Sequence, residues 1–450
     1  MGGMFGKTSI TTARCEKITN LIARMITQDT LPISFVEGKG FRELMAYVEP
    51  AYVVPCAKTV KKRLQCLYTA AKVKVRESLE ETPSVALTTD CWTSSATESY
   101  IALTAHYACP ISFSMVSWVL TTQQFEGRHT GVQITNKLQE VMCEWGIDDK
   151  TSTMVHDNAS NMTLASALSD KWSPLPCSAH SLQLAVNHSL EKSGLTEVVG
   201  LACRLVSHFR HSCIAAGALY MQQQTMNLKR KQLMLYCKTR WNSTFDMLQR
   251  LLENRWAVSA VLSDPLTTKP SAAMAVELTN VQWHIINVIC PVLDPIKLAT
   301  VMLSAEENVS ISIALPTVAG LLDNTVVNDE DPDTVRAFKE EFHQQLTTRF
   351  KLDVRTREDV TVLHKATYLD PRFSHMGFVT AGTKAVVIDV LRQELRSTLL
   401  ASTAALADGE SAATTTGSPQ VPSLTARCKY CCCFTVCSPA ERSDIVLHSN

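Results

Sequence analysis

Two acidic residues are placed where side chains often do chemistry. Asp90 ends the run "SVALTTD", and Asp157 ends the run "TSTMVHD". Two carboxylates that are brought together repel each other unless a cation lies between them, and such pairs hold Mg²⁺ for phosphoryl transfer. An acid at the end of a strand is also a common way to start a turn, so that alternative stays open for Asp90.

The segments around these acids predict an α/β layer. Both runs read as strands, and the segment 98–120 alternates in hydrophobicity around a turn at Cys109–Pro110, which predicts a hairpin. We expect the hairpin beside the strand that ends at Asp90, and the strand that ends at Asp157 on its other side. This order brings both acids to one edge of a mixed sheet, where α/β folds usually carry their site.

Helical segments are predicted on both sides of the second acid. Residues 131–145 carry one apolar stripe, and Gly146 is placed to end that helix. A further helix is expected after Asp157, with Asn158 or Ser160 as its N-cap. From about 197 to 350 the sequence reads as almost all helix.

The composition suits a soluble globular chain of two or three folding units. The 450 residues are 46% hydrophobic and balance 43 acidic against 43 basic side chains, so no overall field attracts nucleic acid. No signal peptide and no bilayer-spanning run is expected. Of the 16 cysteines, five crowd into residues 428–437 without the His or second Cys pair of a zinc finger. They suggest a metal knot or a palmitoylation site.

A run of basic residues without acidic neighbours lies in the N-terminal part. One interpretation, without a functional role, is a solvated helix face. The functional interpretation is a helix that contacts phosphates. The sequence leaves these two open. The residues concerned are Lys58, Lys61, Lys62, Arg63, Lys72, Lys74 and Arg76.

Several motifs together resemble one family. They are "LTTDCWTS…ESYIALTAHY", "HDNASNM", "PCSAHSLQLAVNHSL", "KTRWNSTFDMLQRL" and "ATYLDPRF", in this order along the chain. The pattern, over roughly residues 17 to 400, resembles hAT-superfamily transposases and most closely the animal BED-type zinc-finger proteins derived from them. The resemblance implies a ribonuclease H-like core interrupted by a large α-helical insertion, behind a helical N-terminal segment.

The resulting division of the chain has five parts. They are a helical N-terminal segment (1–81), the first part of the ribonuclease H-like core (82–196), the α-helical insertion (197–350), a helical return segment (351–402) and a low-complexity, Cys-rich tail (403–450) that we expect to be disordered.

The resemblance also assigns expected roles. In the family three acids hold two divalent ions for DNA cleavage and strand transfer, and Asp90 and Asp157 fall on the first two. The Cys177–x–x–His180 pair matches a family motif that follows the second acid. On its residues alone that pair is half a zinc site, so packing or DNA contact is expected rather than zinc. Trp241 matches a family tryptophan, with base stacking and helix packing as its two interpretations.

This sequence departs from the family in three places. The BED finger expected before residue 17 and the C-terminal dimerisation segment are not recognised. The third acid belongs to that segment, and Glu441 in "SPAERSD" is a candidate for it, with Glu394 as another. Asp90 and Asp157 are therefore expected to bind Mg²⁺ at most incompletely.

These observations predict a transposase-derived, non-catalytic nuclear protein, plausible as a transcriptional regulator. Its expected partners are DNA, bound weakly through phosphates, and other nuclear proteins, with no membrane. One alternative is an active hAT-type transposase with a two-metal acidic site. A second is a truncated product without a function of its own.

Overall fold

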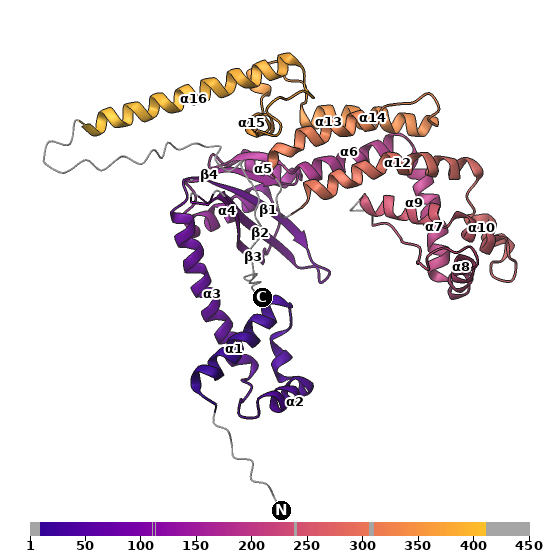
Figure 1. The fold of residues 1–450 in the computed structure, drawn as a ribbon, viewed down its shortest axis with the longest axis horizontal. Helices are drawn as coiled ribbons and strands as arrows, with labels where there is room; N and C mark the ends of the chain where they lie inside the picture. Colours follow the sequence, from indigo (N-terminus) through magenta and orange to yellow (C-terminus); the bar gives the residue numbers. More distant parts are fainter. Residues whose placement is uncertain (1–9, 110, 113, 238–240, 306–309, 411–450) are drawn as a thin grey trace, which may run out of the picture. The chain divides into compact units, whose positions relative to one another are not determined.

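The computed structural model describes residues 10–410 except 110, 113, 238–240 and 306–309, and it divides into two compact units. The first unit ends at Leu175 and the second begins at Pro176. The first contains the N-terminal helices and a five-stranded sheet, and the second is helical (Figure 1). The mixed α/β class predicted from the sequence is confirmed.

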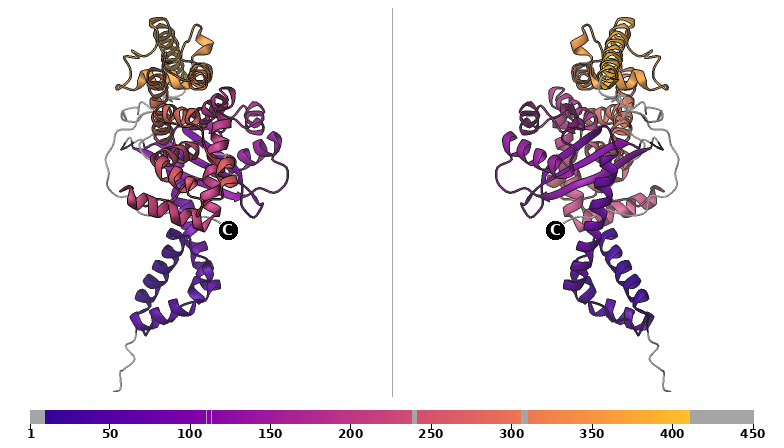
Figure 2. Two further views of the ribbon diagram at one scale, coloured as in Figure 1. Left: turned by 90° about the vertical axis from the view of Figure 1, so that its right-hand side faces the viewer. Right: turned by 90° about the vertical axis from the view of Figure 1, so that its left-hand side faces the viewer.

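The N-terminal segment is helical, as predicted. It contains α1 (Thr12–Gln28), a 3₁₀ turn η1 (Ile33–Glu37), α2 (Lys39–Val48) and α3 (Ala57–Glu80). Figures 1 and 2 show α3 running from the sheet to lie beside α1. Val60 packs in a small core with Ile22 and Ile26 of α1, whereas Val75 and Leu79 pack beneath the sheet. One continuous helix therefore belongs to two hydrophobic cores.

The sheet has the order β3-β2-β1-β4-β5. Its strands are β1 (Val85–Thr93), β2 (Ser99–Ala108), β3 (Met115–Gln124), β4 (Thr151–His156) and β5 (Ser173–Pro176). β1 is antiparallel to β2 and parallel to β4, and β2 is antiparallel to β3. The predicted placement of the hairpin and of the strand before Asp157 on opposite sides of β1 is confirmed. The short edge strand β5 was not predicted.

One face of the sheet is covered by apolar helix faces. Leu87 and Leu103 are fully buried there, together with Ile134, Leu138 and the other stripe residues of α4 (Gly131–Trp145). Gly146 ends α4 with φ of 67°, a left-handed conformation that glycine adopts without strain, as the sequence predicts. The alternate residues of β1 point to the opposite face, and Asp90 is among them.

The second unit is built around one large hydrophobic core. Its α-helices are α6 (Ser178–Lys192), α7 (Leu195–His211), α8 (Cys213–Thr225), α9 (Asn242–Glu253), α10 (Arg255–Ser263), α11 (Pro270–Val276), α12 (Asn280–Leu303), α13 (Ala314–Asn324), α14 (Asp333–Phe350), α15 (Val362–Leu369) and α16 (Ala381–Glu410), with short 3₁₀ turns η2 (Ile311–Ile313) and η3 (Arg357–Asp359). The almost wholly helical segment expected from 197 to 350 is confirmed.

Three local expectations were wrong. β1 does not end at Asp90 but runs to Thr93, because its residues stay paired with β2. The N-cap of α5 (Ser160–Ala167) is Ala159, not Asn158 or Ser160. The disordered tail was expected to start at residue 403, which is too early. Instead α16 continues to Glu410 through an Ala-rich stretch of high helix propensity. The rest of the tail, including the cysteine cluster, lies outside the described residues.

α12 corrects the expectation that no segment could span a bilayer. By length and composition alone it is apolar enough to cross a membrane. Half of its most apolar window is buried inside the protein, and Ile286 and Leu293 belong to the core of the helical unit. These buried positions are those of a core helix packed against α9 and α6.

Candidate functional site

The structure places Asp90 and Asp157 on neighbouring parallel strands. Thr88 of β1 is paired with Val155 of β4, so the same register continued by two residues sets Asp90 opposite Asp157. Neighbouring strands lie about 4.8 Å apart, and residues opposite each other in a parallel pair point to the same face. Both acids therefore lie at the same edge of the sheet, as the sequence predicts.

Buried neighbours fix the position of Asp157. His156 is 4% exposed, and its Nε2 lies 3.1 Å from Ser166 Oγ in α5. Trp172 Nε1 donates to the same hydroxyl at 3.3 Å. Directly after the strand, Asp157 Oδ1 accepts a 3.3 Å hydrogen bond from the backbone N–H of Ala159. The carboxylate is thus bonded to the backbone at the entrance to α5, and the residue before it is anchored to α5.

The negative charges of Asp90 and Asp157 affect the pKa of the Cys91 thiol. Burial, then the negative charge of Asp90 and then that of Asp157 together raise the pKa of Cys91 to about 11. Both carboxylates therefore act on one point in space. A divalent cation held between them would have the opposite effect on the same thiol.

A polar strip on the face of Asp90 was not predicted. His106 of β2 lies with Nε2 2.9 Å from Thr88 Oγ1 and with Nδ1 2.9 Å from Ser117 Oγ. Burial lowers the pKa of His106, which favours its neutral form at pH 7. The alternation of "SYIALTAHYA" already points His106 away from the core, and that is the signal from which the strip could have been found.

The described residues supply two carboxylates but no complete ligand set. Within them, no group of three His, Cys, Asp or Glu side chains could hold a metal ion. The Glu394 carboxylate forms an ion pair with Lys365. Glu441 lies outside the described residues. Asp90 and Asp157 fit a hard cation such as Mg²⁺ that keeps several waters, since carboxylate oxygens are its preferred protein ligands.

The Cys177–x–x–His180 pair opens α6. Cys177 is the N-cap residue and directly follows β5, and its carbonyl accepts from the Ser181 N–H at 2.8 Å. Both side chains are half-buried. No third ligand joins them among the described residues, so the zinc interpretation gains no support. Their expected packing or DNA contact stays a prediction.

Trp241 lies in the helical core. Its side chain is 2% exposed, next to Phe245 and Leu248 of α9. A ring without accessible faces cannot stack on a base in this conformation, so the structure contradicts the DNA-binding assignment. Helix packing, the other interpretation of Trp241, accounts for its position.

Three of the seven basic side chains of α3 bind within the protein. Arg63 Nε donates to Asn20 Oδ1 of α1. The Lys72 ammonium pairs with the Glu144 carboxylate, and Arg76 Nη2 donates to the Glu144 backbone carbonyl at 2.8 Å. These contacts attach α3 to its neighbours, so Arg63, Lys72 and Arg76 have structural roles within the protein.

The remaining basic residues of α3 are exposed. Lys58, Lys61 and Lys62 follow a spacing of three and four that places them on one helix face, and Lys74 is exposed further along. No acidic residue occurs in the sequence between 58 and 76. Their charge is therefore available to an anionic partner, and DNA contact stays a prediction.

The fold and the acidic pair together define a ribonuclease H-like core with a helical continuation. Residues 88–184 match the family model of the ZBED1 RNase-like domain, and residues 175–292 match that of the ZBED1 RNase-like helical domain. Over residues 88–292 the chain is therefore similar to the hAT-type, BED-protein-like group of transposase-derived proteins.

The relatives include both regulators and transposases by name. Zinc finger BED domain-containing protein 4 of Homo sapiens is 24% identical over 84% of this chain and 32% of its own length. A Talaromyces stipitatus protein named as a transcriptional regulator, tpeD, is 25% identical over 64% of this chain and 38% of its own. A Zea mays protein named as an AC transposase is 26% identical over 52% and 31%. The chain spans about a third of the length of these relatives.

Proposed function

We propose that this chain is a DNA-associated nuclear regulator that keeps the transposase core but does not cut or join DNA. The observation that carries the proposal is the exposed basic face of α3 at Lys58, Lys61 and Lys62. Three ammonium groups on one face suit a phosphate backbone, and they carry no base readout of their own. The relatives named as BED proteins and as a transcriptional regulator support the regulatory part.

The non-catalytic part is supported by how the acids are arranged. Strand transfer needs two divalent ions about 4 Å apart, and two carboxylates supply an anchor for one of them. Glu394 is neutralised by Lys365. If Mg²⁺ binds, Asp90 and Asp157 would hold it and it would supply Lewis-acid polarisation of a phosphate oxygen.

DNA binding is tested by charge reversal on α3. The variant Lys58→Glu/Lys61→Glu/Lys62→Glu is expected to weaken binding to all duplex sequences alike. Its plot of log affinity against log salt should be shallower by about 2.7 in slope, since each phosphate contact contributes about 0.9. Fluorescence anisotropy with a labelled 20-bp duplex at several salt concentrations measures both quantities.

A matched control separates this face from overall charge. Lys192, Lys229 and Lys269 are also exposed, and their reversal to Glu changes the net charge equally. We expect the control to bind nearly as the parent chain does. Equal losses in both triple variants would leave only a general charge effect, and unchanged binding in the α3 variant would make that helix a solvated face.

The second candidate function is an active transposase, favoured by the in-register placement of Asp90 and Asp157. Incubation of the purified protein with Mg²⁺ or Mn²⁺ and DNA carrying terminal inverted repeats of a matching element tests it. We expect no cleavage or joining. Metal-dependent products that disappear in Asp90→Ala would establish the enzyme instead.

A further inference from the structure

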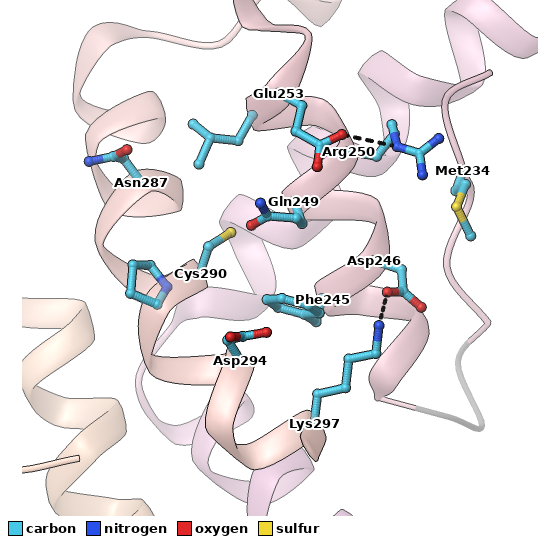
Figure 3. Close-up of a pocket in the computed structure, with 12 residues that line it drawn as sticks. Met234, Phe245, Asp246, Gln249, Arg250, Glu253, Asn287, Cys290, Asp294 and Lys297 are labelled. Atoms are coloured by element: carbon cyan, nitrogen blue, oxygen red, sulfur yellow. Dashed lines mark hydrogen bonds and ion pairs between the residues drawn. The ribbon is translucent and has the colours of Figure 1, made fainter. Parts of the chain in front are cut away.

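The helical unit contains a cavity of about 760 Å³, open to solvent between α9, α12 and the segment at Met234 (Figure 3). Its volume is in the range of small-ligand sites, which is about 300–1,000 Å³. Phe245 and Cys290 line it together with several polar side chains. Neither the acidic pair nor the basic face of α3 contributes a side chain to its lining.

The cationic side chains of the cavity are already neutralised. Lys297 forms an ion pair with Asp246, and Arg250 Nε lies 3.4 Å from Glu253 Oε2. Figure 3 shows both pairs at the wall of the cavity. These groups therefore offer little net positive charge to an anion such as phosphate.

Three further polar side chains are available to a ligand. Gln249 of α9 faces Asn287 and Asp294 of α12 around the cavity (Figure 3). Across the part of the chain that the structure describes, these three side chains have no hydrogen-bond or ion-pair partner. Asp294 therefore gives the cavity an uncompensated negative charge, flanked by two amide groups.

Two prolines in α12 add backbone acceptors. Pro291 and Pro295 lie inside the helix and have no N–H, so the carbonyls of Asn287 and Pro291 cannot accept the usual helical hydrogen bond. Residues four apart share a helix face, and both Asn287 and Pro291 line the cavity. The prolines thus leave carbonyl dipoles on the same side as the free carboxylate.

We propose that this cavity binds an arginine side chain of a partner polypeptide. A guanidinium presents five donors in one plane and no acceptor, which suits a free carboxylate, two amide oxygens and two carbonyls spread over neighbouring turns. An ammonium is a compact point charge with three donors and would satisfy fewer of these acceptors at once. The site is thus a protein-docking point, separate from the lysine face of α3.

The first test compares blocked peptides that differ in one side chain. N-acetyl-arginyl-glycine amide is titrated by calorimetry into the whole protein, beside its citrulline and lysine analogues. Citrulline has nearly the shape of arginine without the charge, so we expect it to bind at least about tenfold more weakly. The affinity of the lysine analogue should lie between those of the arginine and citrulline peptides. Equal binding of the arginine and citrulline peptides, or no binding of either, overturns the proposal.

The second test removes the free charge. Asp294→Asn should weaken binding of the arginine peptide by about tenfold or more. Glu340→Gln, at an exposed carboxylate of α14, makes the same charge change away from the cavity and should leave binding unchanged. Equal losses in both variants would show a non-specific charge effect and overturn the site.

A third variant keeps the result informative if Asp294→Asn disturbs the fold. Pro291→Ala returns an N–H donor to the helix, which closes the carbonyl of Asn287. This substitution should raise the melting temperature of the protein and weaken its binding of the arginine peptide several-fold. Unchanged peptide affinity in this more stable variant would count against the backbone part of the site.

Discussion

The thiol of Cys91 offers a direct measurement of the acidic pair. Its pKa is raised from 9.0 to about 11, by burial first, then by Asp90, then by Asp157. Burial is the largest cause of this rise in the pKa and Asp90 the second, so the charge of Asp90 accounts for at most half of the rise. Asp90→Asn, which keeps the shape and removes the charge, should therefore raise the thiolate fraction by up to about tenfold. Asp157→Asn should produce a smaller rise.

Alkylation by iodoacetamide at pH 8 reads out this change, because the reaction rate follows the thiolate fraction. The peptide that contains Cys91 is followed by mass spectrometry, so the other cysteines do not interfere. Cys290 is the internal control, since burial and the charge of Asp294, in the other unit, raise its pKa to about 12. Its alkylation rate should not change.

The same assay tests for a bound cation. If Mg²⁺ lies between the two carboxylates, millimolar Mg²⁺ should lower the pKa of Cys91 and speed its alkylation in the parent protein, but not in Asp90→Asn/Asp157→Asn. A Cys91 rate that is unchanged or slower in Asp90→Asn would refute the electrostatic argument. A rate insensitive to Mg²⁺ would leave the pair without evidence of metal binding.

Two further predictions concern stability. Hydrogen bonds from Arg372 and then Ser312 outweigh burial and hold the pKa of the Asp370 carboxyl at about 2, below the ordinary 3.8. The stabilisation is complete above pH 4 and is lost as the pH falls through about 2, so Asp370→Asn should cost about 1–2 kcal/mol at pH 7 and little at pH 2, in urea unfolding at each pH. Lys339 and Asp331 form a buried ion pair at 2.7 Å, and Lys339→Met should cost about 3–5 kcal/mol by leaving a buried carboxylate unpaired. Adding Asp331→Asn should recover part of that loss, and a double variant no more stable than Lys339→Met would contradict this reasoning.

Hydrophobic periodicity was enough to predict those helices whose buried face follows from the spacing of their own apolar residues. The stripe of α4 with Gly146 at its end, and the buried face of α14 from Val335 to Phe350, follow from apolar spacing alone. The order of strands around β1 could be predicted from the order of the segments along the chain and from the requirement that Asp90 and Asp157 lie at one edge of the sheet. In these parts local sequence and tertiary structure agree.

Long-range contacts explain what the sequence could not show. The apolar spacing of "RWNSTFDMLQRLLENRW" runs on to Trp256, yet the helix breaks at Asn254, whose side chain bonds Gln223 at 2.7 Å and the Arg250 carbonyl at 2.8 Å. Trp256 is consequently 68% exposed rather than buried. Likewise, nothing in the basic run around Lys72 reveals that Glu144 lies against it.

The double membership of α3 has a mechanical consequence. The helix has 24 residues, so it is about 36 Å long, with one end in the core around α1 and the other beneath the strands that carry the acids. No loop or glycine interrupts the helix. The contacts of Lys72 and Arg76 with Glu144 fix its C-terminal half to α4. A force applied at Lys61 would therefore be transmitted along about 20 Å of continuous helix to the sheet, so a partner bound to the lysines would also constrain the orientation of the strands that carry Asp90 and Asp157.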